Sequence, residues 1–258
     1  MSLLYTAVRG QGIAAAMLGL FLAVAPCAAI ADVAPGGKEE AIAQSLAEML
    51  RDARTVISNN ENLINNPELG DKHLTGQKVL GDAIVLYRKN TGVDPTAIDP
   101  ASRNGRLIHA MMDAIIRVMD ENQVTINEKG VGFKGFIPAV FGRLVSEAFN
   151  SLAKGEAEMK VTAPPDLVRN RKALPDAWEA EIIKTKLLAP DWPQGQPYAA
   201  MVQSGGRPAY RIAVPEYYRQ SCLACHGTPK GELDITGYPK EGRKLGDLGG
   251  VMSITLFH

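Results

Sequence analysis

The chain has 258 residues, of which 46% are hydrophobic and 22% are charged. Its 28 Lys and Arg residues balance 28 Asp and Glu residues, and there are three cysteines. This composition excludes disordered and collagen-like chains, and so few cysteines exclude a small scaffold held together by disulfides. A balanced charge provides no basic surface for polyanions, so we expect no nucleic-acid partner.

The N-terminal segment has the features of an export signal. Residues 11–31 carry no charge, Arg9 precedes them, and Ala29-Ile30-Ala31 forms an A-x-A cleavage pattern. We therefore predict a signal peptide over residues 1–31, a mature chain of residues 32–258 in the periplasm, and no membrane attachment after cleavage. An uncleaved membrane anchor is the alternative, but Pro26 and the small residues after it favour cleavage.

The first half of the mature chain shows helical periodicity. Apolar residues recur at intervals of three and four, which predicts amphipathic helices. A polar loop follows the first helix, Gly92 and Pro95 stop the second, and Pro138 is well placed at the start of the fourth. The expected helices cover roughly 38–63, 79–91, 107–119 and 138–153.

After about residue 155 the pattern changes from helical to alternating. Met159 and Val161 alternate with polar neighbours, and a hairpin of residues 197–203 and 207–214 is expected around the turn Ser204-Gly205-Gly206. A helix over 176–188 and a closing strand over 249–257 complete the pattern. Helices first and hairpin-connected strands later predict an α+β fold with an antiparallel sheet. We expect one domain, mainly helical over 38–155 and mainly sheet over 156–258.

Glycines 130, 132 and 135 match the spacing of a dinucleotide-binding fingerprint. We expect only a short strand before them, a helix starting at a proline after them, and an antiparallel sheet, none of which suits that fingerprint. A glycine-rich turn is the better interpretation.

The clearest motif lies late in the chain, where Cys222-Leu-Ala-Cys225-His226 forms a C-x-x-C-H sequence. Two cysteines at this spacing place both sulfurs on one side of a helical turn, where each can form a thioether with one vinyl group of a porphyrin. The next residue then presents its imidazole to the iron. The motif predicts one covalently attached haem c on Cys222 and Cys225, with His226 as the proximal iron ligand.

Two other interpretations of the cysteine pair are weaker. A zinc site needs two more ligands, but His73, His109 and His258 show no paired spacing and signal cleavage removes Cys27. A redox-active dithiol would leave the adjacent histidine unexplained. Because haem is attached to bacterial chains after export, the predicted signal peptide agrees with the haem interpretation.

The sixth iron ligand is left open by the sequence. His109 follows the apolar stripe of the third helix and His73 lies in a polar loop, so either is a candidate distal ligand. Methionine is the third possibility. The methionines considered are Met49, Met111, Met112, Met119, Met159, Met201 and Met252.

Four cations are candidate partners for the haem propionates, because cationic side chains, and guanidinium groups in particular, bind carboxylates well. They are Lys134, Arg143, Arg169 and Arg171.

Several strings together resemble one family, the periplasmic c-type haem domains with a PAS-like fold, catalogued largely as a domain of unknown function. The resemblance covers roughly residues 38–258. It rests on residues 123–127, 132–143, 169–170, 175–179, 222–227 and 246–250. It implies a PAS-like antiparallel sheet wrapped by an extended N-terminal helix, and a role in redox or small-ligand sensing. Members often carry an output module after the sensor, whereas this sequence stops at His258, so sensing would require a separate signalling protein.

Together these features predict an exported monohaem c-type cytochrome. It would act in electron transfer, or in redox or small-ligand sensing, with a redox partner protein or a signalling protein, and with a small gas as possible ligand. The alternative is a haem enzyme such as a peroxidase or reductase. No catalytic constellation is evident and no catalytic residue is predicted, so we expect a binding or electron-transfer protein rather than an enzyme.

Overall fold

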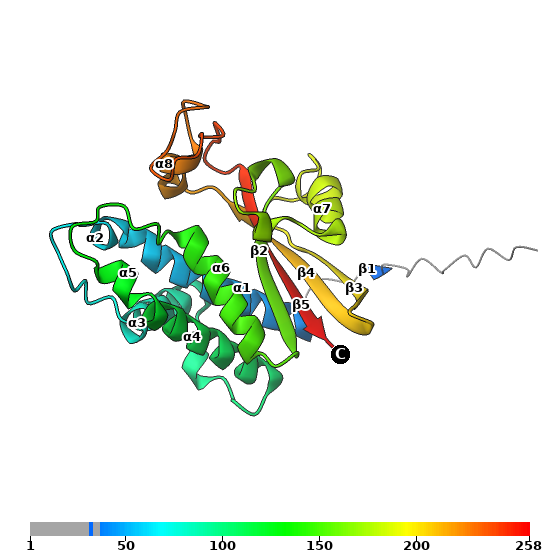
Figure 1. Ribbon diagram of the computed structural model, residues 1–258. Helices are drawn as coiled ribbons and strands as arrows, with labels where there is room; N and C mark the ends of the chain where they lie inside the picture. Colours follow the sequence, from blue (N-terminus) through cyan, green and yellow to red (C-terminus); the bar gives the residue numbers. More distant parts are fainter. Residues whose placement is uncertain (1–30, 33–36) are drawn as a thin grey trace, which may run out of the picture.

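The computed structural model describes residues 31–32 and 37–258 (Figure 1). The predicted signal peptide, residues 1–31, lies outside these residues except for its last position. The main helices are α1 (Lys38–Asn59), α2 (Glu61–Ile64), α3 (Gly76–Thr91), α4 (Arg103–Glu121), α5 (Gln123–Asn127), α6 (Pro138–Leu152), α7 (Ala177–Ile182) and α8 (Leu223–His226). The strands are β1 (Ala31–Asp32), β2 (Ala157–Thr162), β3 (Tyr198–Ser204), β4 (Arg207–Tyr217) and β5 (Leu248–Phe257). Among the helices of the described residues, none is both long enough and apolar enough to cross a membrane.

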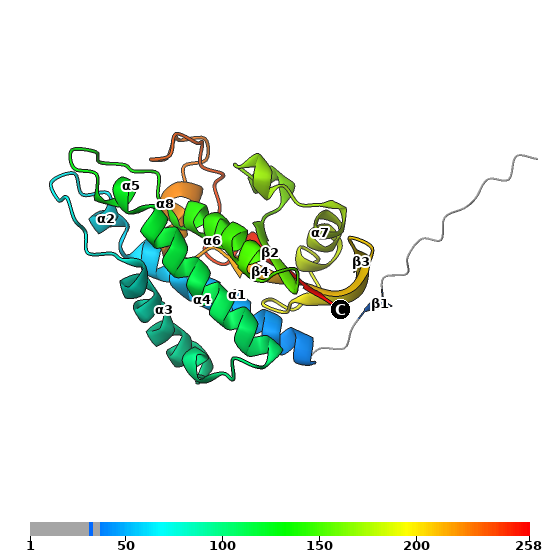
Figure 2. The same cartoon turned by 60° about the horizontal axis from the view of Figure 1, so that its bottom comes forward.

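Helices α1, α3, α4 and α6 pack against one another, and α1 and α6 also lie against the sheet (Figure 2). Each begins and ends near the residues that the sequence pattern indicates. Gly92 ends α3 with a φ of 72°, and Pro138 occupies the first turn of α6. The first helix differs from expectation because it breaks at Asn60, whose side-chain amide donates to the Val56 carbonyl, and α2 restarts after it.

The strands form one antiparallel sheet in the order β1-β3-β4-β5-β2. Strands β3 and β4 are the expected hairpin, in which Gly205 and Gly206 both adopt positive φ and form a two-residue turn whose twist matches the strands. Strand β2 pairs along β5 and forms one edge of the sheet. The α+β class with an antiparallel sheet is confirmed.

The sheet is buried on both faces, and the alternation of its side chains decides which face each one joins. Tyr210, Ile212 and Val214 of β4 point into the large core under the helices. Ala213, between them, points to the opposite face, where α7 and the π-turn Ile183–Leu187 form a smaller apolar cluster.

The segment before the three glycines is a helix, α5, and the expected short strand is wrong. Its Val-Thr-Ile sequence favours a strand, but tertiary contacts outweigh that preference. Ile126 is fully buried in the helical core, and the Gln123 side chain donates to the carbonyls of Leu74 and Met119. A one-turn continuation of α4 satisfies these contacts, which an extended strand would not.

Between β4 and β5 the chain leaves the sheet for residues 218–247, which we call the motif loop. It contains α8 and projects beyond one end of the sheet, in orange at the top of Figure 1. Two backbone hydrogen bonds hold its base together, because the Tyr218 amide donates to the Asp247 carbonyl and the Gly246 amide to the Tyr218 carbonyl.

Candidate functional site

The two motif cysteines lie on a single turn. Cys222 ends a 3₁₀ turn and stands directly before α8, in which Cys225 and His226 are the last two residues. Residues three apart on a helical turn lie on the same side. Neither cysteine forms a disulfide, and both residues are partly exposed.

Glycine is required directly after the motif. A Cβ atom on Gly227 would lie 2.5 Å from the Leu223 carbonyl oxygen, closer than side chains approach backbone. Gly227 donates its amide to that same carbonyl at 2.9 Å, which closes the turn behind His226.

The surroundings of the Cys225 thiol favour its protonated form. Burial raises the pKa of Cys225, and the negative charges of Asp234 and Glu61 raise it further, while Arg169 opposes them.

His226 has a defined hydrogen-bond partner. Its ring Nδ1 lies 2.8 Å from Glu241 Oε2. Burial acts to raise the pKa of Glu241, but hydrogen bonds from Arg169 and His226 outweigh it, and the pKa falls below the usual range. A carboxylate only accepts, so Nδ1 carries the hydrogen, and the lone pair of neutral His226 is on Nε2. The Tyr218 ring packs against the imidazole with ring centres 4.9 Å apart.

The position of Glu241 follows from the path of the motif loop. Backbone hydrogen bonds join Arg243 to His226 and Gly242 to Gly227, so the returning chain runs beside α8. This pairing brings residue 241 next to residue 226 although fifteen positions separate them in sequence.

Arg169, from the segment between β2 and α7, ties the loop together. Its guanidinium donates to both Glu241 oxygens at 2.8 and 3.1 Å, to Asp234 at 2.6 Å and to the Cys225 carbonyl at 3.0 Å. Burial alone would lower the pKa of Arg169, but these two carboxylates raise it overall. Arg169 therefore connects the cysteine turn to the part of the motif loop that contains Glu241 and Asp234.

Asp234 organises the tip of the loop. Its side chain is fully buried, and its Oδ1 accepts from the amides of Thr236 and Tyr238 and from the Thr236 hydroxyl. Burial acts to raise its pKa, but the bonds from Thr236 and Arg169 lower it well below the usual range. The tip is thus built around a carboxylate that remains charged.

The motif loop also carries exposed apolar side chains. Leu233, Ile235 and Leu245 are 66%, 64% and 65% exposed, and Tyr238 is 46% exposed. Exposed large apolar side chains are typical of a surface that contacts a ligand or a partner. Two cysteines that form no disulfide and a histidine whose Nδ1 is held by a carboxylate are the donor set that covalent haem attachment requires.

The two candidate distal histidines lie apart from this turn. His109 donates to the Gly105 carbonyl within α4 and lies near Glu156, whose carbonyl accepts from Phe257 at the end of β5. The motif loop meets the other end of β5, which is roughly 30 Å away because nine residue steps of about 3.3 Å separate the two ends of the strand. His73 is 87% exposed and pairs with Asp71 in the loop before α3. The structure brings neither histidine to His226.

Of the four candidate propionate partners, Arg169 is the one that hydrogen-bonds to the cysteine turn, through the Cys225 carbonyl. Its guanidinium is already engaged by protein groups. Lys134 donates to the Val131 carbonyl, Arg143 pairs with Glu147 along α6, and Arg171 is exposed in a short 3₁₀ turn. Arg169 is therefore the one of these four cations that a hydrogen bond joins to the cysteine turn within the described residues.

Three residues of the site escaped the sequence interpretation, namely Tyr218, Asp234 and Glu241. Each is an ordinary residue type in a loop without periodicity, and its role arises from contacts between segments far apart in sequence. The one available signal was the number of acidic residues close behind the motif, which alone does not say which carboxylate reaches the histidine.

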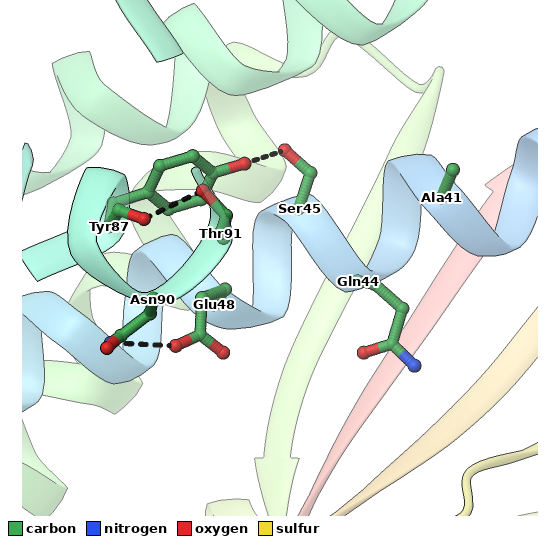
Figure 3. A pocket seen from close by; sticks show the side chains of 7 residues that line it. All are labelled: Ala41, Gln44, Ser45, Glu48, Tyr87, Asn90 and Thr91. Atoms are coloured by element: carbon green, nitrogen blue, oxygen red, sulfur yellow. Dashed lines mark hydrogen bonds between the residues drawn. The ribbon is translucent and has the colours of Figure 1, made fainter. Parts of the chain in front are cut away.

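Two surface hollows of the described residues lie elsewhere. One, of about 310 Å³, lies between α1 and α3, and the other, of about 370 Å³, lies beside His109. Figure 3 shows that side chains lining the first bind one another: the hydroxyls of Ser45 and Tyr87 are 2.8 Å apart, and Asn90 donates to Glu48. Because these groups already satisfy each other, the cysteine turn remains the better candidate site.

Comparison with known proteins identifies one family. A family model described as Tll0287-like matches residues 89–256, more than half of the chain, from the end of α3 through β5. The matched region includes the cysteine turn, Arg169 and the motif loop. Searches of curated proteins and of solved structures found no match. The chain belongs to the Tll0287-like family, a family built on a domain of unknown function.

Proposed function

We propose that this protein is an exported monohaem c-type cytochrome that acts in electron transfer or in redox or small-ligand sensing. Haem would be attached through thioethers to Cys222 and Cys225, and Nε2 of His226 would bind the iron. The observation that carries the proposal is the hydrogen bond from His226 Nδ1 to Glu241, 2.8 Å long. Histidines that bind metals ordinarily donate their other ring nitrogen to a carboxylate or carbonyl in this way.

When bound, haem supplies reversible one-electron chemistry and an iron site for a small ligand. The chain's own residues orient the histidine, shape the turn and exclude water. Glu241 and Tyr218 hold the imidazole in one orientation, and Gly227 closes the turn behind it. The apolar side chains of the motif loop would exclude water from the porphyrin.

The test is an optical spectrum of protein purified from the periplasm of a host that matures c-type cytochromes. We expect a c-type pyridine haemochrome with one haem per chain, retained after acid-acetone extraction. The Cys222→Ala/Cys225→Ala double variant should lose its haem to the solvent. A wild-type protein without covalent haem would overturn the proposal.

Carbon monoxide separates the two proposed roles. A reduced spectrum unchanged by the gas indicates an occupied sixth position and favours electron transfer or redox sensing. A rapid Soret shift indicates an open position and favours small-ligand sensing. His109→Ala and His73→Ala are informative controls, because neither side chain approaches His226 and neither variant should change the spectrum.

The same hydrogen bond favours a second function, a haem enzyme such as a peroxidase. A carboxylate that accepts from the axial histidine raises its basicity and its electron donation to iron. Peroxide turnover well above that of a denatured haem peptide would support this function, and turnover equal to that of the peptide would exclude it.

A further inference from the structure

Glu241, in the motif loop, and Arg169, from the segment before α7, form a chain of hydrogen bonds that ends on His226. The inference rests on the proposed haem attachment. Glu241 Oε2 accepts from His226 at 2.8 Å and from Arg169 at 3.1 Å, while Oε1 accepts from Arg169 at 2.8 Å. The carboxylate is 16% exposed, so water screens its charge only weakly.

Such a carboxylate distinguishes between the two oxidation states. Oxidation adds a positive charge to the iron and makes the Nδ1 hydrogen of an axial histidine more acidic, so its bond to a carboxylate strengthens. A nearby negative charge also stabilises the more positive state. Both effects favour the oxidised protein.

Arg169 keeps Glu241 in position. Its planar fork binds both carboxylate oxygens, and a third N–H bonds to the Cys225 carbonyl, next to His226 itself. Asp234, fully buried, holds the other side of the guanidinium at 2.6 Å. Arg169 thus fixes the distance between the carboxylate and the turn that carries the histidine.

We propose that Glu241, held by Arg169, is a positioning residue for His226 that stabilises the oxidised haem and keeps its reduction potential low. The role assigned to Arg169 is indirect and passes through Glu241.

The test is the midpoint potential of the holoprotein, measured by spectroelectrochemistry. Glu241→Gln removes the charge while keeping the shape, and we expect a shift to higher potential. Glu232→Gln is the matched control, because Glu232 lies in the same loop, pairs with Lys240 and is exposed. Its potential should equal that of the wild type. Equal potentials for the Glu241 and Glu232 variants would overturn the proposal.

A second variant separates the effect of the hydrogen bond on the potential from the effect of the negative charge. Glu241→Asp keeps the charge but shortens the side chain, so the potential should again rise, by less than in Glu241→Gln. It also provides the measurement if the glutamine variant fails to fold. A wild-type potential in Glu241→Asp would overturn the role of the hydrogen bond.

The role of Arg169 is tested by a double-variant cycle. Arg169→Lys keeps a positive charge but cannot bond both oxygens of Glu241 and the Cys225 carbonyl. Its effect on the potential should disappear in the Glu241→Gln background, since it acts through Glu241. Additive shifts would overturn this role.

These outcomes are distinguishable from failure of the proposed function. A wild-type chain without covalent haem refutes both proposals. A c-type haemochrome in every variant with unchanged potentials refutes the role of Glu241 alone.

Discussion

At the scale of single residues, the structure shifts the pKa values of two buried carboxyl groups in opposite directions. Asp234 accepts from Arg169 and Thr236, so its pKa lies below the usual range in spite of burial. Asp52, on the face of α1 toward α3, has one oxygen bonded to Asn90 and one oxygen without a hydrogen-bond partner. Burial and the neighbouring charge of Glu48 raise its pKa to about 6. The first group stabilises the fold when charged and the second when protonated.

Asp52→Asn should therefore stabilise the fold most at high pH. The unfolded carboxyl titrates near 3.8 and the folded one near 6, so the folded wild type gains stability as the pH falls from about 6 to 4. Arg51 and Arg219 partly offset the penalty of the charged form. We expect the free energy of unfolding of the variant to exceed that of the wild type by a larger amount at pH 8 than at pH 4.5.

Urea unfolding at both pH values checks this expectation. Asp113→Asn removes a carboxylate at an exposed position of α4 and is the control for the loss of one negative charge. A pH-independent difference for Asp52→Asn would contradict the expected titration.

Asp234→Asn should show the opposite behaviour. A carboxyl with a lowered folded pKa contributes stability above its unfolded pKa, near 3.9, and this contribution is lost as the pH falls below that value. Loss of its charged hydrogen bonds should lower the free energy of unfolding by about 2 kcal/mol at pH 7. The difference from wild type should shrink at pH 3, as measured by guanidinium titration. A constant difference would show that the charge is not responsible.

At the scale of elements, the end of β4 is clamped to α1 just before the motif loop. Glu216, beside a register irregularity in β4, pairs with Arg51 at 2.7 Å and with Arg54 at 3.0 Å. All three side chains are less than one quarter exposed. This contact joins the long N-terminal helix to the strand that leads into the cysteine turn.

Glu216→Gln should destabilise the fold by about 1–2 kcal/mol, between the values for exposed and fully buried ion pairs. Glu147→Gln removes the exposed pair with Arg143 on α6 and should cost less than about 0.5 kcal/mol. Chemical denaturation of both variants checks the ranking. Equal decreases in the free energy of unfolding would show that the pairs of Glu216 with Arg51 and Arg54 stabilise the fold no more than an exposed surface pair does.

Two glycines should respond oppositely to alanine. Gly227→Ala forces a Cβ against the Leu223 carbonyl and should cost about 1–3 kcal/mol and reduce the yield of covalent haem. Gly81→Ala, in the exposed interior of α3 with nothing within 4 Å, should stabilise by about 0.5–1 kcal/mol. Thermal unfolding and haem staining measure both effects. A neutral Gly227→Ala would mean that the turn relaxes without cost.

At the scale of the whole molecule, two apolar clusters share one sheet. The larger lies under the helices, and the smaller lies under α7 with Trp178 and Trp192 packed against it. Because alternate residues of the same strands belong to each cluster, neither face can lose its packing without disturbing the other. We expect both faces to unfold in one transition.

Phe141→Ala, fully buried in α6, tests this coupling and should cost about 3–5 kcal/mol. Tryptophan fluorescence reports the α7 face, because both tryptophans lie there, while far-ultraviolet circular dichroism reports mainly the helices. Both denaturation curves should shift together. A shift of the dichroism curve alone would show that the two faces unfold separately.

The sequence by itself determined the order and type of most elements. The helices α1, α3, α4 and α6, the β3–β4 hairpin and the closing strand β5 follow from apolar periodicity and from Gly and Pro at their ends, which are local properties. The cysteine turn was equally evident, since Cys222, Cys225 and His226 are adjacent in sequence. The sequence interpretation missed α5, where tertiary contacts outweighed the local preference for a strand. It also missed the break at Asn60, where the Asn60 side chain donates to the Val56 carbonyl of the same helix.

Only the tertiary structure decided what surrounds the cysteine turn. Arg169 and Glu241 are 72 positions apart, and their meeting depends on how the motif loop folds back beside α8. The same long-range packing sends His109 to the far end of β5, although its place on an apolar stripe suggested a ligand. Periodicity reports which face of an element is buried, but it carries no information on which distant segment covers that face.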